Sequence, residues 1–488
     1  MLMEKKMQTK VIDVAVLGGG VVGSAIFNAL VKSGYSTILL EKGGDLAVGA
    51  SKANSGLVHA GFDAKPGTLK ARFNVEGNKM YPEMCKRLGL PLKKCGAYVV
   101  GNDKNVVEDL LNRGVKNGVD GLSLLTEKEL KQRIPNIQEG ITCGLFSENS
   151  YIVNPYLLTI CLAEEGVVNG GSVLLNYEAK RIKLNDTSVK KITNEDVWHI
   201  TNDDIRVFAR HIINCCGNNY NEVAKLIGAE QYNIEFKRGE YYVLDHSEQN
   251  LVSSTIFPLP SQHGKGVLVT PTIDGNVLVG PTSYLSDTST KTTKEGLNSV
   301  KEKSGQLIKD VNLSKAIRVF SGVRAIVGDD FVIEKSKLAK NVINVAGICS
   351  PGLSSAPAIA KYVVELLGFK YNPNVKTTKI KPYTNLNILT ESQKNKLIKQ
   401  NPDYGKIVCK CENISKGEIV DAINRPIKCT TTDGIKKRVR PGMGRCQGAF
   451  CLDRVISILA EENHIPKEKI TKENRGSEII VSKIKEVQ

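Results

Sequence analysis

The sequence has no uninterrupted apolar segment long enough to cross a membrane. Its most apolar stretch, residues 11–31, follows three lysines and superficially resembles a signal peptide, but Asp13, Asn28 and several glycines interrupt it. A membrane-spanning helix needs about 20 consecutive apolar residues, and a signal peptide has an unbroken apolar centre. We therefore expect a cytoplasmic protein, with peripheral contact at the inner face of the membrane left open.

The chain also lacks a basic tail and a run of aromatic residues that would stack on bases, although its formal net charge is +16. Such a surplus suits nucleic acid, an anionic membrane or a small anionic substrate. The charge is spread along the chain, and its densest short cluster is Lys436, Lys437, Arg438 and Arg440. This dispersion argues against a nucleic-acid partner and leaves a small anionic substrate as an expected partner.

Internal repeats and low-complexity tracts are absent as well. The 488 residues, 41% of them hydrophobic, are enough for two or three domains with a sizeable core. Of the twelve cysteines, four lie in one C-terminal segment. In a long chain without a secretion signal, clustered cysteines indicate a reducing compartment and a metal site, not disulfides.

The N-terminal region predicts a dinucleotide site. Residues 11–17 read as a buried strand, 21–33 as a helix and 36–40 as a second strand. Between the first two lies G-x-G-x-x-G, with glycines that permit a tight turn, close approach to a pyrophosphate and helix–strand packing. Phosphates would lie at the helix N-terminus, where N–H groups and the dipole favour anions. Glu41, at the end of the second strand, is placed to accept from ribose hydroxyls.

The glycine motif alone does not distinguish FAD from NAD. Residues 49–61 (GASKANSGLVHAG) are small and polar, which suits a chain threading past a flat cofactor ring. Residues 211–217 (HIINCCG) form an apolar strand ending in glycine. Both patterns favour a two-dinucleotide-fold flavoprotein.

Several motifs, in order from about residue 11 to 368, carry a family resemblance. They are NSGLVHAG at 54–61, PGTLK at 66–70, RGEYY at 238–242, TIDG at 272–275, LVGP at 278–281, SGVR at 321–324 and SPGLSSAP at 350–357. Together they resemble the D-amino-acid-oxidase-like flavoproteins, and more narrowly the FAD-dependent glycerol-3-phosphate dehydrogenases and oxidases and the L-2-hydroxyglutarate dehydrogenases.

The resemblance implies non-covalent FAD and an α/β fold, with a Rossmann-like FAD-binding domain interleaved with a mixed β-sheet substrate domain. We expect one FAD-dependent oxidoreductase unit over residues 1–370. Its FAD-binding pieces would be about 11–80, 150–220 and 320–370, and its substrate pieces about 81–149 and 221–319. Residues 371–403 read as a linker, 404–471 as a small, mainly α iron–sulfur domain and 472–488 as a terminal extension.

The resemblance also assigns site residues. Those expected to contact the cofactor are Gly18, Gly20, Val22, Gly23, Glu41, Lys42, Ser51, Asn54, Ser55, Gly56, Gly217, Gly347, Gly352, Leu353 and Ser354. The start of the helix near Ser354 would stabilise negative charge on reduced flavin. Cys349 lies nearby, and we expect a buried small residue there.

His59 and Arg324 are the expected catalytic residues. Imidazole ordinarily titrates near neutral pH, so His59 can take a hydroxyl proton as hydride leaves for flavin N5. The planar guanidinium of Arg324 suits a substrate phosphate or carboxylate. Arg238 and Lys265 are weaker candidates for substrate binding, since the former can simply shape the sheet and the latter can be a loop lysine.

The four C-terminal cysteines are spaced as C-x-C, Cys409 and Cys411, and C-x4-C, Cys446 and Cys451. Two close pairs of thiolates can hold zinc or a [2Fe–2S] cluster, and spacing alone leaves both open. Residues 440–448 (RPGMGRCQG) resemble the bacterioferritin-associated-ferredoxin-like domain, which implies a [2Fe–2S] cluster. Glycines here leave N–H groups for cluster sulfurs, and we expect the basic run 436–440 to offset the cluster's negative charge.

These resemblances imply oxidation of sn-glycerol 3-phosphate to dihydroxyacetone phosphate, with electrons leaving through the cluster to a protein or quinone-linked acceptor. An L-2-hydroxyacid dehydrogenase acting on a substrate such as 2-hydroxyglutarate is the nearest alternative, because both substrates are anionic secondary alcohols. An amine or imino-acid dehydrogenase fits His59 less well. A flavin and iron–sulfur electron carrier, or a redox sensor without its own substrate, is the alternative from another class.

Overall fold

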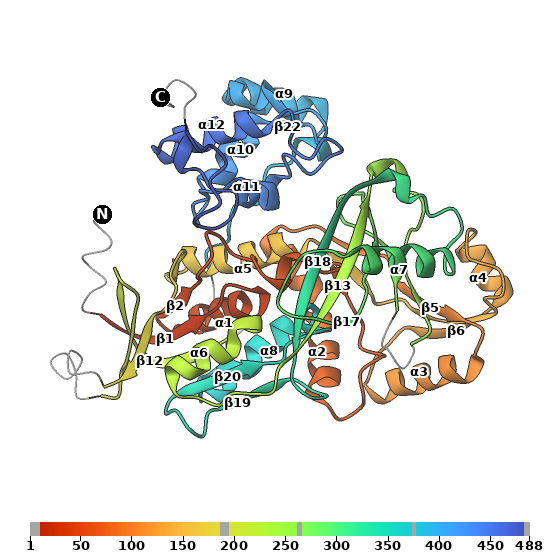
Figure 1. Ribbon diagram of the computed structural model, residues 1–488, viewed down its shortest axis with the longest axis horizontal. Coiled ribbons are helices and arrows are strands. Elements are labelled where there is room, and N and C mark those ends of the chain that lie inside the picture. The colour runs from red at the N-terminus through yellow and green to blue at the C-terminus, as the bar shows by residue number, and fades with distance from the viewer. Residues whose placement is uncertain (1–9, 186–194, 261–265, 373–376, 483–488) are drawn as a thin grey trace.

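Two β-sheets with flanking helices form the body of the molecule, and a small helical module sits on one side of it (Figure 1). The computed structural model describes residues 10–185, 195–260, 266–372 and 377–482. The first sheet carries the glycine-rich turn, the second carries Arg324, and the module carries the four clustered cysteines.

The first sheet is built on parallel strands from distant parts of the sequence. Its order is β10-β11-β12-β1-β2-β9, with β20 pairing with β12 and β19 with β20. β1, β2, β9, β12 and β20 run parallel along their ladders, whereas β10, β11 and β19 are antiparallel additions. The strands are β1 (Val11–Leu17), β2 (Thr37–Leu40), β9 (Ser172–Leu174), β10 (Arg181–Leu184), β11 (Trp198–Thr201), β12 (Arg206–Asn214), β19 (Val332–Lys335) and β20 (Val342–Ala346).

Alternation along β1 explains why helices cover both faces of this sheet. Val14 and Val16 pack into one core with helices α1, α5 and α8, and Ala15 and Leu17 pack into another with α6. Successive side chains of a strand point to opposite faces, so an apolar run with no polar alternation is buried on both. The helices are α1 (Val21–Lys32), α2 (Leu69–Leu88), α5 (Pro155–Val168), α6 (Tyr220–Ile227) and α8 (Gly352–Leu366).

The second sheet is mixed and larger. Its order is β17-β13-β16-β15-β14-β5-β7-β6, with β18 pairing along nearly the whole of β13, and only the β14–β5 pair is parallel. The strands are β5 (Ala97–Gly101), β6 (Leu122–Thr126), β7 (Cys143–Ser147), β13 (Glu235–Leu244), β14 (Thr255–Pro258), β15 (Leu268–Pro271), β16 (Val277–Gly280), β17 (Tyr284–Leu285) and β18 (Ala316–Ile326). Helices α3 (Lys104–Lys116), α4 (Glu127–Arg133) and α7 (Lys294–Gly305) flank it. A third sheet has three strands in the spatial order β3-β8-β4, namely β3 (Leu57–Val58), β8 (Tyr151–Val153) and β4 (Leu92–Lys94).

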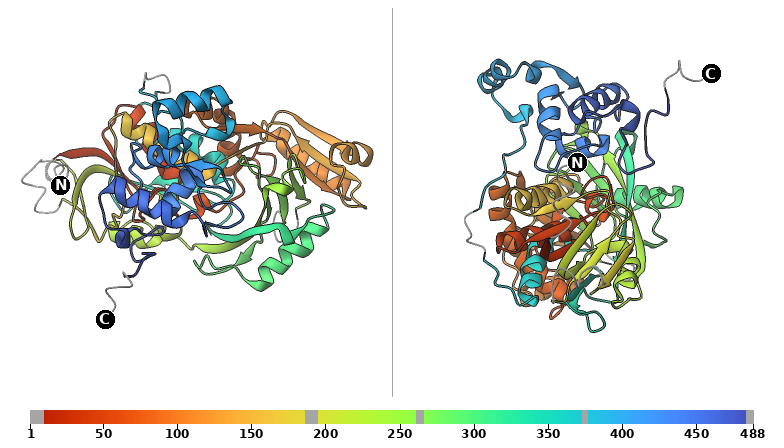
Figure 2. Two further views of the ribbon diagram at one scale, coloured as in Figure 1. Left: turned by 90° about the horizontal axis from the view of Figure 1, so that it is seen from above. Right: turned by 90° about the vertical axis from the view of Figure 1, so that its left-hand side faces the viewer.

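The C-terminal module has its own apolar core. Ile419, Ile435 and Leu459, one from each of its three helices, are fully buried together. Its elements are β21 (Ile407–Cys409), β22 (Ile414–Ser415), α10 (Lys416–Ile423), α11 (Thr432–Val439) and α12 (Leu452–Asn463). Figure 2 shows this blue module on the same side of the body in a second view, with α11 nearest the body in Figure 1.

The expected α/β class with a mainly helical C-terminal module is confirmed. Some predicted boundaries fall inside elements. Residue 320 lies within β18, residue 81 lies within α2, and the stretch expected as a plain linker contains the helix α9 (Glu391–Gln400). A Thr390 side chain that caps α9 and a Gln393 that reaches back explain that helix.

Charged pairs hold the module against the body. Arg438 on α11 donates to both oxygens of Asp45 at 2.6 and 3.0 Å, and both side chains are buried. Lys437 donates to the Leu46 carbonyl at 2.8 Å. The basic run was expected to offset cluster charge. Instead Lys437 and Arg438 face the carboxylate of Asp45, and Arg440 pairs with Glu412 and Asp274.

Among the described residues, no helix combines the length and the apolar character needed to cross a membrane.

Candidate functional site

A cavity of about 1360 Å³ lies between the first sheet and the β13–β18 ladder. The glycine-rich turn, the loop 48–55 and the start of α8 line it from the first side. Strands β13 and β18, with residues 281–285, line it from the other. Segments far apart in sequence thus meet around one space large enough for a dinucleotide and a small substrate.

The tight turn after β1 leaves no space for a side chain at two of its glycines. A Cβ on Gly18, whose φ is +104°, would lie 2.6 Å from the Cys215 carbonyl oxygen, and one on Gly23 would lie 2.0 Å from the Gly18 carbonyl oxygen. Gly20 differs, because its Cβ would meet only Ser51 Oγ, at 3.2 Å. The packing of the turn therefore does not require glycine at position 20. Glycine there leaves space on the cavity side for a ligand.

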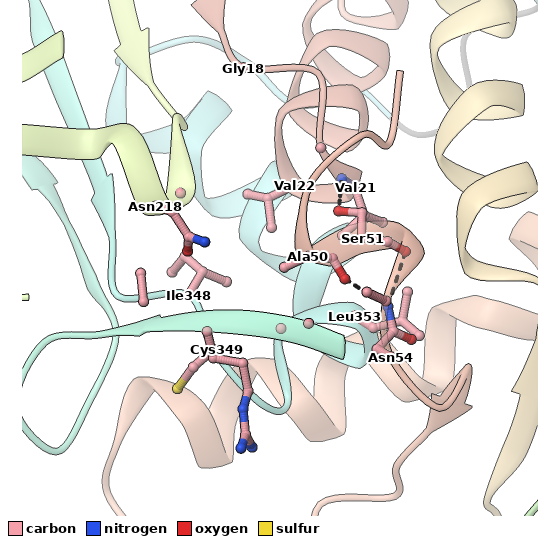
Figure 3. Close-up of a pocket in the computed structure, with 18 of the residues that line it drawn as sticks. Gly18, Val21, Val22, Ala50, Ser51, Asn54, Asn218, Ile348, Cys349 and Leu353 are labelled. Carbon is pink, nitrogen blue, oxygen red and sulfur yellow. Dashed lines mark hydrogen bonds between the residues drawn. The ribbon is translucent and has the colours of Figure 1, made fainter. Parts of the chain in front are cut away.

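Helix α1 presents an uncompensated N-terminus to this cavity. Its N-cap Gly20 provides no side-chain cap, and its first turn contains no acidic residue. Val21 N–H donates to Ser51 Oγ at 2.9 Å, which fixes the loop 50–54 beside the helix start (Figure 3). The positive end of the helix dipole is thus available to an anion such as a pyrophosphate.

Glu41 lies at the cavity wall after β2. Its carboxylate accepts from Gly19 N–H at 2.6 Å and from Gly43 N–H at 2.7 Å, and burial raises its pKa despite these two donors. Each carboxylate oxygen has a second lone pair that can accept from a ribose hydroxyl.

A second helix start faces the same cavity. α8 begins at Gly352 without a side-chain cap and without an acidic residue in its first turn. Gly352, Leu353 and Ser354 line the cavity. Tyr81 Oη donates to the Leu353 carbonyl at 2.6 Å and holds this segment in place. The helix end supplies positive potential where negative charge on a ring would develop.

His59 follows β3 and is 5% exposed. Its backbone N–H donates to Ser354 Oγ at 2.8 Å, which ties it to the start of α8, and its side chain lines the cavity. Gly61 N–H donates to His59 Nδ1 at 3.0 Å. Nδ1 is therefore an acceptor in this arrangement, and the neutral ring carries its proton on Nε2.

Arg324 and Lys237 lie directly opposite each other on the antiparallel β18 and β13 strands. Both line the cavity, as do the next residues of the same strand face, Gly239, Tyr241 and Gly322. Arg324 Nη2 donates to Ser283 Oγ at 3.2 Å. Within the described ranges, neither cation has a carboxylate partner. Like charges directly opposite on a sheet repel, so this pair favours an anion between them.

Arg238 does not join this site. Neighbouring residues of a strand face opposite ways, and Arg238 pairs with Asp287 at 3.0 Å and donates to the Ser289 carbonyl. Its expected contact with substrate stays a prediction, which this pairing does not support. Lys265 lies outside the described residues.

Most of the residues expected at the cofactor line the cavity, namely Gly18, Gly20, Val22, Gly23, Glu41, Lys42, Ser51, Asn54, Ser55, Gly217, Gly352, Leu353 and Ser354. Gly56 and Gly347 do not. Gly56 instead packs its backbone against Val153, since a Cβ there would lie 2.5 Å from that carbonyl oxygen. Cys349 was expected to be buried but is partly exposed and faces the cavity (Figure 3).

Sequence reasoning missed Lys237, Asn218 and Asn474 as lining residues. Lys237 could have been predicted from the sequence, because alternate residues of a strand point to the same face and Lys237 alternates with Gly239 and Tyr241. Asn218 follows Gly217 directly and its amide donates to the Val323 carbonyl, at 3.3 Å. Asn474 lies more than 400 residues from the loop that it meets, and no local pattern could have indicated it.

The four clustered cysteines stand as two pairs. Cys411 and Cys446 have their sulfurs 3.6 Å apart, and Cys409 and Cys451 are hydrogen-bonded to each other. Two thiolates on one tetrahedral metal with bonds of about 2.3 Å lie about 3.8 Å apart, so the Cys411–Cys446 pair has a spacing that suits one metal ion. In the described part of the chain, no three His, Cys, Asp or Glu side chains converge on one metal position. Two pairs of sulfurs suit the two iron atoms of a binuclear cluster.

Within each pair, the pKa of one thiol is lowered and that of its partner, Cys451 or Cys411, is raised. The Cys451 thiol, hydrogen-bonded to Cys409, lowers the pKa of Cys409. Burial alone would raise the pKa of Cys446, but backbone N–H donors at Gly448 and Phe450 lower it. A Cβ on Gly444 would lie 2.4 Å from Cys411 Cβ, so that glycine lets the two segments close around the pairs. The donor set and its backbone N–H groups fit an iron–sulfur cluster.

Comparison with known proteins agrees with both halves of this site. Residues 13–366 match the family model of FAD-dependent oxidoreductases, and residues 407–461 match the BFD-like [2Fe-2S] binding domain. A glycerol 3-phosphate dehydrogenase of Caloramator mitchellensis is 41% identical over 98% of this chain and 100% of its own length. A glycerol 3-phosphate oxidase of Mycoplasma genitalium is 32% identical over 75% of this chain and 98% of its own.

A solved structure agrees as well. The L-alpha-glycerophosphate oxidase of Mycoplasma pneumoniae, solved with FAD bound, has a TM-score of 0.71 and 29% identity, and it covers 77% of this chain and 100% of its own. The expected FAD and [2Fe–2S] cofactors are confirmed. The chain therefore belongs to the FAD-dependent oxidoreductase family and carries a C-terminal BFD-like [2Fe-2S] domain.

Proposed function

We propose that the enzyme oxidises sn-glycerol 3-phosphate to dihydroxyacetone phosphate and passes the electrons through its [2Fe–2S] cluster. The observation that carries the substrate assignment is the pair of cavity-facing cations, Arg324 and Lys237, which no described carboxylate neutralises. A phosphate dianion suits two adjacent cations. The relatives named above as acting on glycerol 3-phosphate support the same substrate.

Other residues of the cavity bind the cofactor, stabilise charge on it and orient the substrate. Gly20 and the start of α1, in the tight turn that Gly18 and Gly23 permit, would hold the pyrophosphate of FAD, and Glu41 would accept from its ribose. The bound flavin supplies the ring that takes two electrons from the alcohol carbon. The start of α8 stabilises the negative charge that this creates. Arg324 and Lys237 orient the substrate through its phosphate, so that the C2 hydroxyl lies within reach of His59.

His59 is the proposed acceptor of the hydroxyl proton, and the structure sets a condition on that role. With Nδ1 accepting from Gly61 N–H, the ring proton is on Nε2. Nε2 in that tautomer donates to the substrate oxygen. Taking a proton at Nε2 requires the other tautomer, with its proton on Nδ1, and so the loss of the Gly61 hydrogen bond. The alcohol then loses one proton to His59 and two electrons with its C2 hydrogen, which balances formation of the ketone.

An exposed side chain in the loop between Cys446 and Cys451 is evidence for an external electron acceptor. Phe450 lies between two of the cysteines in sequence and is 85% exposed. An exposed aromatic side chain beside a redox centre is suited to contact with a protein or a quinone-linked subunit. Peripheral membrane contact is part of the same proposal, since a quinone acceptor lies in a membrane.

A second candidate substrate is an L-2-hydroxyacid. The planar fork of Arg324 binds a carboxylate as well as a phosphate, and an L-2-hydroxyglutarate dehydrogenase of Mus musculus is 27% identical over 72% of this chain and 87% of its own length. The test is product formation under anaerobic conditions with an artificial dye as acceptor. Dihydroxyacetone phosphate from glycerol 3-phosphate supports the proposal. Turnover of L-2-hydroxyglutarate alone would assign the second substrate, and no turnover of either would favour an electron carrier.

A further inference from the structure

The segment that follows the [2Fe–2S] domain returns to the dinucleotide cavity. Residues 471–478, here called the C-terminal hairpin, fold back on themselves, with Lys472 N–H donating to the Ser477 carbonyl at 2.7 Å. Ser477 Oγ donates to the Asn474 carbonyl at 2.6 Å and fixes the turn. Asn474, at the tip, is one of the residues that line the cavity.

The hairpin tip contacts the loop that begins at Glu41, the residue proposed to accept from the ribose of FAD. Gly44 N–H donates to Asn474 Oδ1 at 3.2 Å, and the adjacent Gly43 N–H donates to Glu41. A Cβ on Gly44 would lie 2.3 Å from the Glu473 carbonyl oxygen, so this approach requires glycine. The loop and the hairpin are therefore built to fit together.

A second cavity wall is held by the same hairpin. Lys52 Nζ contacts Glu473 Oε1 at 2.5 Å, and Lys52 directly follows Ser51, whose hydroxyl accepts from the first N–H of α1. The hairpin thus contacts both the loop 41–46 and the turn 50–52, which border the cavity on its dinucleotide side.

The hairpin is also fastened to the cluster module. Thr432 N–H donates to the Thr471 carbonyl at 3.2 Å, and Asp433 N–H donates to the Lys472 carbonyl at 2.9 Å. Both acceptors belong to the start of the hairpin, and both donors to the start of α11. From the end of that helix, Lys437 and Arg438 hold Leu46 and Asp45 of the dinucleotide loop. The loop 41–46 therefore contacts both the hairpin and the module, and its first residues line the cavity.

We infer that the C-terminal hairpin is part of the FAD site, with Asn474 closing the cavity beside Glu41, so that FAD binding and docking of the [2Fe–2S] module strengthen each other. If the module stabilises the loop that binds FAD, FAD must stabilise the docked module by the same free energy. The inference rests on the proposed placement of FAD in this cavity. It gives the terminal segment a role in retaining the cofactor.

The test compares full-length holoenzyme variants by the rate at which FAD is released, read from the rise in flavin fluorescence on dilution. Asn474→Ala removes the acceptor for Gly44 N–H, and release should be about five times faster, as expected for one net hydrogen bond. Asn424→Ala is the matched control, because Asn424 is an exposed residue of the same module whose side-chain amide donates to Val420 and Glu462, both in the module. It should release FAD at the wild-type rate.

A variant in the cavity distinguishes failure of the hairpin inference from failure of the proposed FAD site. Gly20→Ala should fold, because Gly20 has an ordinary φ of −77°, but its methyl group occupies the cradle and should weaken FAD binding. If Gly20→Ala binds FAD as tightly as wild type, the placement itself fails. If it weakens binding while Asn474→Ala behaves like Asn424→Ala, only the hairpin inference is overturned.

Reciprocity gives a second readout on the wild-type protein. Trypsin cleaves after Lys472 and Arg475, both exposed in the hairpin. Excess FAD should slow cleavage at these two sites relative to FAD-depleted protein. Equal cleavage rates in the two samples would overturn the inference.

Discussion

Replacing Asp45 by asparagine should destabilise the whole molecule strongly. Asp45 receives two hydrogen bonds from Arg438 and lies 3.3 Å from Lys437 Nζ, and the Arg438 side chain has no exposed surface. The Arg438 Nε atom has no hydrogen-bond partner among the described residues, and besides Asp45 the guanidinium donates to the uncharged Gly434 carbonyl, so Asp45 supplies the opposite charge. Breaking a buried pair by removing one partner leaves an uncompensated charge and costs about 3–5 kcal/mol.

The assay is urea unfolding followed by fluorescence. The chain has a single tryptophan, and Trp198 is 3% exposed in the first sheet, so its emission reports loss of that core. Glu127→Gln is the control, because it removes an exposed pair with Lys131 on α4 and should leave the midpoint unchanged. A shift for Asp45→Asn no larger than that of the control would refute the reasoning.

The same pair gives a pH dependence with a defined sign. Burial alone would raise the pKa of Asp45, but Arg438 and Lys437 lower it well below its usual value. A carboxylate with a depressed pKa in the folded state contributes stability above its unfolded pKa of about 3.9 and loses it progressively below. Wild type should therefore lose stability more steeply than Asp45→Asn as the pH falls below about 4.

Variants at three residues test the proposed site. His59→Asn should lower kcat by about 10²–10⁴-fold in stopped-flow flavin reduction while FAD stays bound; unchanged kcat would exclude His59 as the base. Arg324→Gln should raise KM for glycerol 3-phosphate by about 10–100-fold, as for loss of a hydrogen bond to a charged group, and Arg324→Lys less; an unchanged KM in steady-state assays would remove Arg324 from phosphate binding. Cys446→Ser should abolish the cluster's electron paramagnetic resonance signal after reduction but leave flavin reduction by substrate unchanged. A retained signal would show that Cys446 is not a ligand.

The dinucleotide half of the site could be predicted from the sequence because its determinants are local. The turn between β1 and α1 needs glycine at Gly18 and Gly23 for steric reasons within the same few residues. The strand predicted at residues 11–17 matches β1 residue for residue, because the glycine-rich turn that follows directly ends the apolar run. The cysteine spacing indicated that the four thiols gather, but not how they pair. Cys411 lies beside Cys446 and Cys409 beside Cys451, so each pair in space joins one cysteine of each sequence motif.

The parts that sequence could not supply depend on pairing between distant segments. Nothing local indicates that Lys237 faces Arg324, because that follows from the β13–β18 register. The same register turns Arg238 away from the cavity and toward Asp287. The basic run 436–440 was expected at the cluster, but a carboxylate nearly 400 residues earlier in the chain determines where Arg438 points.

The most direct test of the central claim is anaerobic absorbance of the purified protein after addition of glycerol 3-phosphate, with L-2-hydroxyglutarate in parallel. We predict that glycerol 3-phosphate alone bleaches the flavin band and that the cluster signal then follows in electron paramagnetic resonance. A flavin that dithionite reduces but glycerol 3-phosphate does not bleach would contradict the account.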